Sequence, residues 1–224
     1  MTASTPSAPA QAFVFADLAS YTALTEIHGD EEAVRLVEDY CKAVRQLLPD
    51  HGGREVKTIG DALLVRVPDA GEAVRLGIRA AREIGAAEHR FPSVRVGMHY
   101  GPAIERAGDY FGRTVNIAAR VSALAGAGEV LVTEDVMQAA GELDAVRFIA
   151  RGRHPLRGIE DPVAIYLASP GAQQSPEGLP IDPVCHMAVD PDRAAGMVVH
   201  EGVRYHFCSV HCVRRFASEP EQFV

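Results

Sequence analysis

Two aspartates stand where the hydrophobic pattern predicts strand ends. Asp17 closes the apolar run 12–16, and Asp61 lies in the turn between the runs 55–58 and 62–67. Carboxylates are preferred ligands of hard divalent cations. Acids at adjacent strand ends could hold two such cations, with phosphate oxygens completing the coordination shells. Either aspartate taken alone also suits an ordinary turn or cap, which is the simpler interpretation.

Two further residues have side chains suited to reading a nucleotide base. Lys57 precedes Asp61 by four positions, and only two of the 22 lysines and arginines in the chain are lysines. A lysine ammonium is a compact point donor that suits a single ring nitrogen, although surface charge is the alternative. Asp109, in the segment GDYFG, could accept a hydrogen bond from an exocyclic amine or cap the following helix.

An asparagine and an arginine share one face of a predicted helix. Asn116 and Arg120 are four positions apart in GRTVNIAAR, so both side chains project from the same side. An amide beside a guanidinium suits a sugar oxygen and a phosphate, while a solvated helix face is the alternative. The sequence has neither a GxxxxGK(S/T) phosphate loop nor a GxGxxG motif, so a nucleotide would be held by another arrangement.

These residues lie on elements that the hydrophobic periodicity predicts. Helical spacing and stop signals predict helices over 30–48, 69–84 and 112–125, the second opened by a capping box of Asp69 and Glu72. Apolar runs predict strands with hairpins at 59–61 and at 101–102, the latter joining 94–100 to 103–106. Because hairpins interrupt the alternation of strands and helices, an α+β fold with a mixed or antiparallel sheet is favoured over a doubly wound parallel sheet.

Composition and segment boundaries predict two folded regions. Of the 224 residues, 47% are hydrophobic and 23% are charged, which is typical of globular proteins. The net charge of −8 argues against a nucleic-acid partner, and no apolar run approaches the ~18 residues of a membrane segment. Residues 1–10 are expected to be a disordered tail and residues 169–180 a linker, which leaves folded regions at 11–168 and 181–224.

Three of the four cysteines lie in the last 40 residues. An odd number of thiols without an export signal favours a metal site in a reducing, cytoplasmic compartment over disulfides. Thiolates suit Zn²⁺ or Cu(I), although small buried core residues are the alternative. The candidate thiol ligands are Cys185, Cys208 and Cys212. The fourth ligand stays open between water and one of three histidines, which are His186, His206 and His211.

The segments FADLASYT, VKTIGDALL, VGMHYGP and GDYFGRTVNIAAR together closely resemble the catalytic domain of class III adenylate and guanylate cyclases. The resemblance extends over about residues 11–168. It implies a ferredoxin-like cyclase fold with a mixed, largely antiparallel sheet and covering helices. It also implies a homodimer that converts ATP to 3′,5′-cyclic AMP and pyrophosphate, using two Mg²⁺ or Mn²⁺ ions in each active site.

The resemblance implies roles for residues that would bind the metal ions and the phosphates. Asp17 and Asp61 match the two metal-binding aspartates, and Leu18 matches a position whose backbone also faces metal. The residues that follow match the loop whose amides receive the phosphates, and they are Ala19, Ser20, Tyr21 and Thr22.

The remaining matches concern the base, the ribose and the phosphates. Lys57 and Asp109 match the pair that reads the purine, in the combination typical of adenylate cyclases; guanylate cyclases usually have Glu and Cys there. Asn116 matches the residue that orients the ribose, Arg120 the residue that stabilises the transition-state phosphate, and Arg157 a basic residue at the terminal phosphate. In this family the metal-binding residues and the base- and ribose-binding residues come from opposite subunits.

The C-terminal region, 181–224, resembles a YHS domain in its DPVC start, its YHFCS core and a further cysteine four positions on. It departs from the usual pattern at His186, where glycine is common. The resemblance implies a heavy-metal-binding module whose metal could regulate the cyclase. Two other functions remain open: a nucleotide-binding metal sensor or trafficking protein that is catalytically weak, and a guanylate cyclase.

Overall fold

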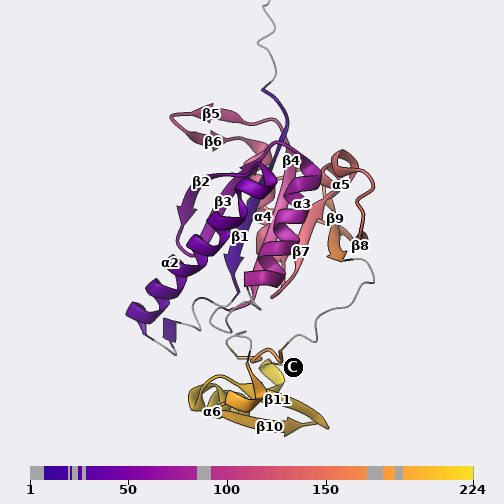
Figure 1. Ribbon diagram of the computed structural model, residues 1–224. Coiled ribbons are helices and arrows are strands. Elements are labelled where there is room, and N and C mark those ends of the chain that lie inside the picture. The colour runs from indigo at the N-terminus through magenta and orange to yellow at the C-terminus, as the bar shows by residue number, and fades with distance from the viewer. Residues whose placement is uncertain are drawn as a thin grey trace, which may run out of the picture.

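A seven-stranded sheet forms the larger part of the computed structural model, which describes residues 8–19, 21, 25–26, 29–84, 92–170, 179–184 and 189–223. The strand order is β2-β3-β1-β4-β7-β9-β8 (Figure 1). Neighbouring strands are antiparallel except β4 and β7, which are parallel, so the predicted α+β class with a mixed, largely antiparallel sheet is confirmed. The strands span Gln11–Leu18 (β1), Arg54–Ile59 (β2), Ala62–Val67 (β3), Val94–Gly101 (β4), Val130–Thr133 (β7), Val146–His154 (β8) and Val163–Pro170 (β9).

Helices cover both faces of this sheet. Three of them concern the site: α2 (Asp30–Leu47) and α3 (Ala70–Arg79) lie across one face (Figure 1), and α4 (Arg113–Leu124) packs on the other. Strand β1 serves both layers because its side chains alternate. Val14 and Leu18 join the core beneath α2 and α3, whereas Phe13 and Phe15 join the cluster beneath α4.

A glycine brings α4 into direct contact with the sheet. An ideal Cβ at Gly97, on β4, would lie 2.0 Å from the backbone nitrogen of Ser122 on α4. No side chain fits in that space, so β4 and α4 can meet this closely only with glycine here. The helix that carries Asn116 and Arg120 is thereby held at one height above the sheet.

Two of the predicted turns and caps are confirmed, and one is wrong. Asp69 accepts the backbone N–H of Glu72 at 2.8 Å and caps α3, which continues as a π-helical segment, Ala80–Ile84. The hairpin of β2 and β3 also forms as predicted. The hairpin expected around 101–102 does not, because Pro102 lacks the N–H that would continue the ladder.

The strand that follows pairs instead with the next one along the chain. β5 (Ile104–Arg106) forms a separate hairpin with β6 (Asp109–Phe111). The turn is made by Ala107 and Gly108, which both have positive φ, at 52° and 81°. Two consecutive positive values are what a tight I′-type hairpin turn requires. This hairpin places Asp109 beside β2 rather than at the cap of α4.

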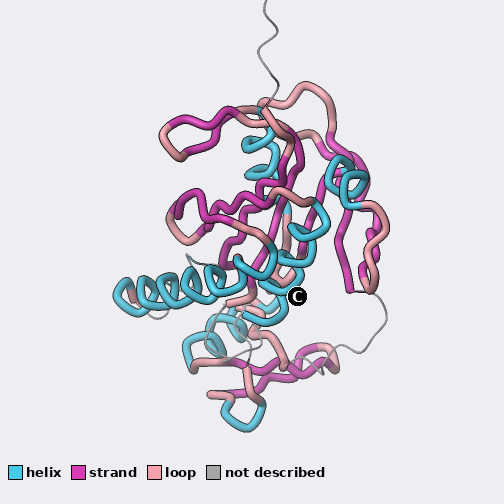
Figure 2. The backbone as a smooth tube through the Cα atoms, turned by 45° about the horizontal axis from the view of Figure 1, so that its top comes forward, coloured by secondary structure: helices cyan, strands magenta, loops and turns pink. Residues whose placement is uncertain are grey.

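The C-terminal module has its own small core. β10 (Gly196–His200) and β11 (Val203–Phe207) form an antiparallel pair against α6 (Val210–Ser218), which Figure 2 shows as a unit with its own strands and helix. Phe207, Cys212 and Phe216 are fully buried there. The remaining short elements are α5 (Glu134–Ala140) and the 3-10 turns Pro49–His51, Pro191–Arg193 and Pro220–Gln222. β9 runs to Pro170, two residues beyond the expected end of the first folded region.

Candidate active site and C-terminal thiol site

The two candidate metal-binding aspartates lie at the same edge of the sheet. Asp17 is the penultimate residue of β1, Asp61 immediately precedes β3, and the two strands pair with Ala16 opposite Leu63. Burial raises the pKa of Asp61 to about 6, and the hydrogen bond and negative charge of Asp17 add to the rise. The two carboxyl groups therefore lie close enough for the charge of Asp17 to affect the ionisation of Asp61.

The surroundings of these acids fit a divalent cation. Asp17 is 9% exposed, and its Oδ1 atom is buried without a hydrogen-bond partner in the described part of the chain. An orphaned buried carboxylate oxygen is costly unless a cation or donor compensates it. A second carboxylate, on Asp61, adds to the same shortage of positive charge. Hard oxygen donors in such a group are what Mg²⁺ or Mn²⁺ requires.

Arg95 is a member of this site that the sequence analysis missed. It lies directly opposite Asp17 on β4 and donates two hydrogen bonds to Asp17 Oδ2, at 2.6 Å from Nη2 and 3.0 Å from Nε. The guanidinium thus compensates Oδ2 of Asp17 and leaves the buried Oδ1 uncompensated. Only the register between β1 and β4 brings the two residues together, and no local sequence signal encodes that register.

The loop after β1 departs from one expectation. The N–H of Ala19 donates to the carbonyl of Ser93 at 2.8 Å, so this amide is not available to a phosphate. The bond extends the contact between the ends of β1 and β4 by one residue. Leu18 is fully buried, and Tyr21 packs against the main core. The other two expected loop residues, Ser20 and Thr22, lie outside the described residues.

The two candidate base-reading residues form an ion pair. Lys57 Nζ, on β2, lies 2.6 Å from Asp109 Oδ2, on β6, and the pKa of Asp109 is lowered chiefly by this hydrogen bond. Asp109 Oδ1 accepts the N–H of Tyr110 at 2.8 Å. Gly112 is the N-cap residue of α4, so the alternative role of Asp109 as helix cap is wrong. The donor and the acceptor are held side by side, 52 positions apart in sequence.

The ribose and phosphate candidates point away from their own sheet. Asn116 and Arg120 are exposed on α4, whereas Ile117 and Ala118 between them are buried. Neither exposed side chain forms a hydrogen bond or ion pair within the part of the chain that the structure describes. Arg157 is also exposed, in the turn after Leu156, which packs against α4. Within one chain, these three residues therefore do not lie in one site with Asp17 and Asp61.

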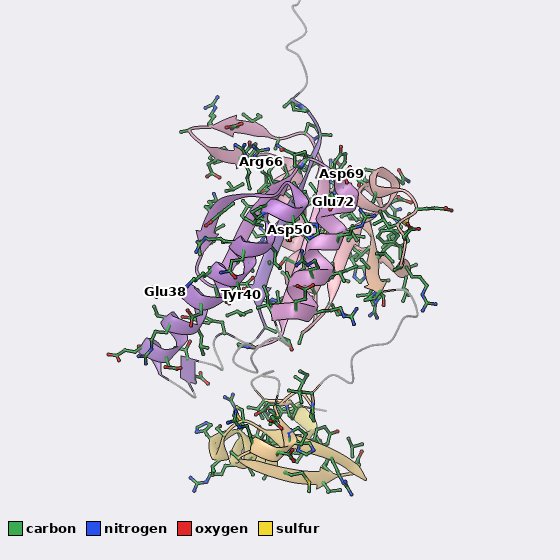
Figure 3. All side chains as sticks on the ribbon, in the orientation of Figure 1. Glu38, Tyr40, Asp50, Arg66, Asp69 and Glu72 are labelled. Atoms are coloured by element: carbon green, nitrogen blue, oxygen red, sulfur yellow. The ribbon has the colours of Figure 1, made fainter. Side chains whose placement is uncertain are left out.

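A buried tyrosine adjoins the acidic pair. Tyr40, labelled on α2 in Figure 3, is 0% exposed, and its hydroxyl has no hydrogen-bond partner among the described residues. Burial raises its pKa well above the usual value, and the charges of Cys41, Asp17 and Asp61 contribute in that order. The phenol therefore stays neutral beside the two aspartates. Its position in a helical apolar pattern conceals it from sequence analysis.

The C-terminal thiols meet at the start of α6. Cys208 Sγ and Cys212 Sγ lie 3.8 Å apart, and Ser209 caps the helix by accepting the N–H of Cys212 at 3.1 Å. A carboxylate oxygen of Asp182 lies within 4.8 Å of both sulfur atoms. Asp182 was not predicted as a ligand, because an aspartate in the segment DPV is typical of a turn. Two thiols and a carboxylate are donors that fit a transition-metal ion.

The other candidate ligands of the module do not join this group where the structure describes them. His211 is exposed on α6. His206 has a buried Nδ1 atom without a partner in the described residues, but the three-residue group does not include it. Cys185 and His186 lie outside the described residues.

Comparison with known proteins identifies the larger region. A family model of the adenylate and guanylate cyclase catalytic domain matches residues 5–169. The chain belongs to this cyclase family. A YHS domain model matches residues 181–224, so the predicted pair of families is confirmed. No helix in the described part of the chain is both long and apolar enough to cross a bilayer.

Several curated relatives are similar to the cyclase. The chain is 34% identical over 176 residues to a pH-sensitive adenylate cyclase of Mycobacterium tuberculosis, covering 77% of this chain and 44% of that protein. It is 40% identical over 118 residues to an adenylate cyclase of Streptomyces coelicolor, covering 53% of this chain and 31% of that protein. The chain thus spans less than half the length of these relatives.

A solved structure supports the fold. The adenylyl cyclase CyaB from P. aeruginosa superposes with a TM-score of 0.65 at 22% identity, covering 74% of this chain and 96% of that one. At this identity the similarity shows the cyclase fold alone, in agreement with the fold predicted from sequence.

Proposed function

We propose that the chain is an adenylate cyclase that converts ATP to 3′,5′-cyclic AMP and pyrophosphate at two sites shared across a homodimer. The observation that carries the proposal is the interacting pair of Asp17 and Asp61, with one carboxylate oxygen buried and uncompensated. In the proposed active site this pair holds two Mg²⁺ or Mn²⁺ ions. Such ions lower the pKa of an attacking hydroxyl and neutralise the charge of transferring and leaving phosphates.

In the proposed site the protein residues chiefly bind and orient. Arg95, already beside Asp17, adds a positive charge at the phosphate end of the site. Asn116 would orient the ribose so that its 3′-oxygen faces the α-phosphorus, and Arg120 would stabilise the charge that develops on the phosphate. Arg157 would contact the terminal phosphate. Positioning and electrostatic stabilisation account for most of the acceleration in phosphoryl transfer.

The paired Lys57 and Asp109 favour adenine over guanine. The ammonium can donate to a ring nitrogen, and the carboxylate can accept from the exocyclic amine of adenine. Guanine presents a carbonyl oxygen at the equivalent position, so the carboxylate would face another acceptor. Their 2.6 Å contact holds both groups in place before the base arrives, which lowers the entropic cost of binding.

The exposed face of α4 supports the homodimer. Asn116 and Arg120 face solvent in one chain, so a second copy is needed to bring them opposite the aspartates. Two-fold symmetry would then build two equivalent sites. The hairpin of β5 and β6 also exposes apolar side chains, with Ile104 at 61% and Phe111 at 49%, which a partner chain would cover.

A single assay tests the proposed reaction. Purified protein is incubated with ATP or with GTP in the presence of Mn²⁺, and the cyclic product is measured. The proposal expects cyclic AMP as the main product. An excess of cyclic GMP would make the chain a guanylate cyclase. Nucleotide binding without turnover would contradict the enzymatic proposal.

We further propose that residues 11–168 and 181–224 act as two domains in a reducing cytoplasm, and that the metal of the C-terminal module regulates the cyclase. Cys208 and Cys212, 3.8 Å apart, support a bound Zn²⁺ or copper ion. Regulation requires that the metal favours one state of the cyclase over another. Cyclase activity at saturating Mg²⁺ should therefore change on adding or chelating the module's metal, and unchanged activity would contradict the regulatory proposal.

A further inference from the structure

Asp182 is the buried acid of the C-terminal module. It is 0% exposed, and its two carboxylate oxygens accept the backbone N–H groups of Val184 and Cys208, each at 2.9 Å. The same bonds fix the direction of the carboxylate and tie it to the backbone of a thiol residue. A ligand group held in this way is oriented before a metal arrives.

The two sulfur atoms already have the separation that tetrahedral coordination requires. With metal–sulfur bonds of about 2.3 Å, two thiolates at tetrahedral angles lie about 3.8 Å apart. Cys208 Sγ and Cys212 Sγ are 3.8 Å apart. Two thiolates on opposite sides of an ion would instead be about 4.6 Å apart at the same bond length. The measured separation therefore fits a bent pair with room for further ligands.

The carboxylate of Asp182 lies close to both sulfur atoms. One oxygen of Asp182 is within 4.8 Å of both sulfur atoms. Tetrahedral coordination with zinc–oxygen bonds of about 2.0–2.2 Å would need an oxygen–sulfur separation of about 3.6 Å, so the oxygen has to move by at most about 1.2 Å. The hydrogen bond from the N–H of Cys208 holds acid and thiol together during such a movement.

We propose that Asp182 is a direct oxygen ligand of the module's metal, and that the resulting sulfur and oxygen donor set selects Zn²⁺ over Cu(I). The inference rests on the proposed metal site of this module and specifies its ligand and its metal. Cu(I) is selected by soft thiolate and thioether donors, whereas zinc accepts thiolate and carboxylate in one tetrahedral shell. A hard carboxylate among the thiols therefore stabilises zinc and contributes little to Cu(I).

The test compares Asp182→Asn with a matched control, Asp190→Asn, in the metal-free full chain. Asp190 lies in the same module, where it caps the turn Pro191–Arg193 through the N–H of Asp192. Affinities for Zn²⁺ and for Cu(I) are measured by competition with a chromophoric chelator. Asp182→Asn should weaken zinc binding at least about tenfold, since even outer-shell partners of a metal site contribute 10–100-fold. Cu(I) binding should change much less, and Asp190→Asn should change neither.

Each other outcome has a defined meaning. An equal loss of zinc and Cu(I) affinity would make Asp182 a residue that only orients the thiols, and unchanged zinc affinity would exclude it as a ligand; both overturn the inference. Wild-type protein that binds neither metal would refute the proposed metal site itself.

A measurement on the wild-type chain covers the case in which Asp182→Asn fails to fold. X-ray absorption of the zinc-loaded protein should show sulfur at about 2.3 Å together with an oxygen or nitrogen shell at about 2.0–2.2 Å. A shell of sulfur alone would contradict the inference.

Discussion

The chain contains two candidate metal sites that are built in opposite ways. Asp17 and Asp61 are 44 positions apart, offer hard oxygen donors, and meet only because β1 and β3 pair. Cys208 and Cys212 are four positions apart, offer soft sulfur donors, and meet because a capped helix begins between them. The first site depends on the pairing of the sheet and, in the proposed homodimer, on a second chain, whereas the second depends mainly on local structure. Substitutions should therefore affect the two sites separately.

The largest effect is expected for Asp17→Ala. The substitution removes the buried carboxylate and leaves Arg95 without its partner, so cation binding at the sheet edge should fail. Cyclase kcat should fall by more than the roughly 10²–10³-fold that loss of one preorganised donor costs. Zinc binding by the C-terminal module should not change. Activity within tenfold of wild type would contradict the role of Asp17, and a parallel loss of zinc binding would contradict the independence of the sites.

Arg120→Ala should have the next largest effect. The side chain is exposed on α4 and forms no hydrogen bond or ion pair with the described residues, so stability should be unchanged while kcat falls by about 10²–10³-fold. Mn²⁺ binding, followed by electron paramagnetic resonance, should remain. Arg113 is also an exposed arginine on α4, so Arg113→Ala is the matched control. This variant should keep most of the activity. A lower thermal midpoint with unchanged kcat would indicate a structural role instead.

A smaller change is expected in base selectivity. Lys57→Glu together with Asp109→Cys replaces the ion pair with the residue types usual in guanylate cyclases. The ratio of kcat/KM for ATP to that for GTP should fall at least tenfold, because a site built to hydrogen-bond one base discriminates strongly against another. Reverting either position alone should restore only part of the preference. An unchanged ratio would mean that the pair does not read the base.

The smallest effect is expected from pH in the metal-free protein. The pKa of Asp61 is raised to about 6 from 3.8, so the folded state binds more protons than the unfolded state between these values. Stability should therefore increase as pH falls from 7 towards 4. Thermal unfolding in chelator should show this gain for wild type and a smaller gain for Asp61→Asn. Cation affinity should decline over the same range, because only the ionised carboxylate binds the ion.

The contrast between the two sites also explains what could be predicted from the sequence. Asp17 and Asp61 could be predicted because the neighbouring residues indicate the ends of strands. The start of α3 could be predicted because its capping signal lies within four consecutive residues. Arg95 was not predicted because its contact with Asp17 depends on the register of β1 with β4. Asp182 was not predicted because it lies 26 positions from Cys208 in the sequence, and only the fold brings the two residues into contact.

The errors have a similar physical origin. The expected hairpin after β4 failed because a proline removed a ladder bond and a better turn lay five residues further on. The amide of Ala19 was expected to face a phosphate, but the backbone of Ser93 takes its hydrogen bond. Both outcomes are decided by competition between backbone partners, which residue types alone do not reveal.

The central claim is that one chain supplies the acids and its partner supplies the asparagine and arginine. Mixing Asp17→Ala chains with Arg120→Ala chains tests it most directly, because half of the randomly formed dimers would then contain one intact site. We predict that activity recovers from near zero to as much as about one quarter of the wild-type value. If the mixture were no more active than the two inactive proteins measured separately, although exchange of chains had been demonstrated, the shared site would be contradicted.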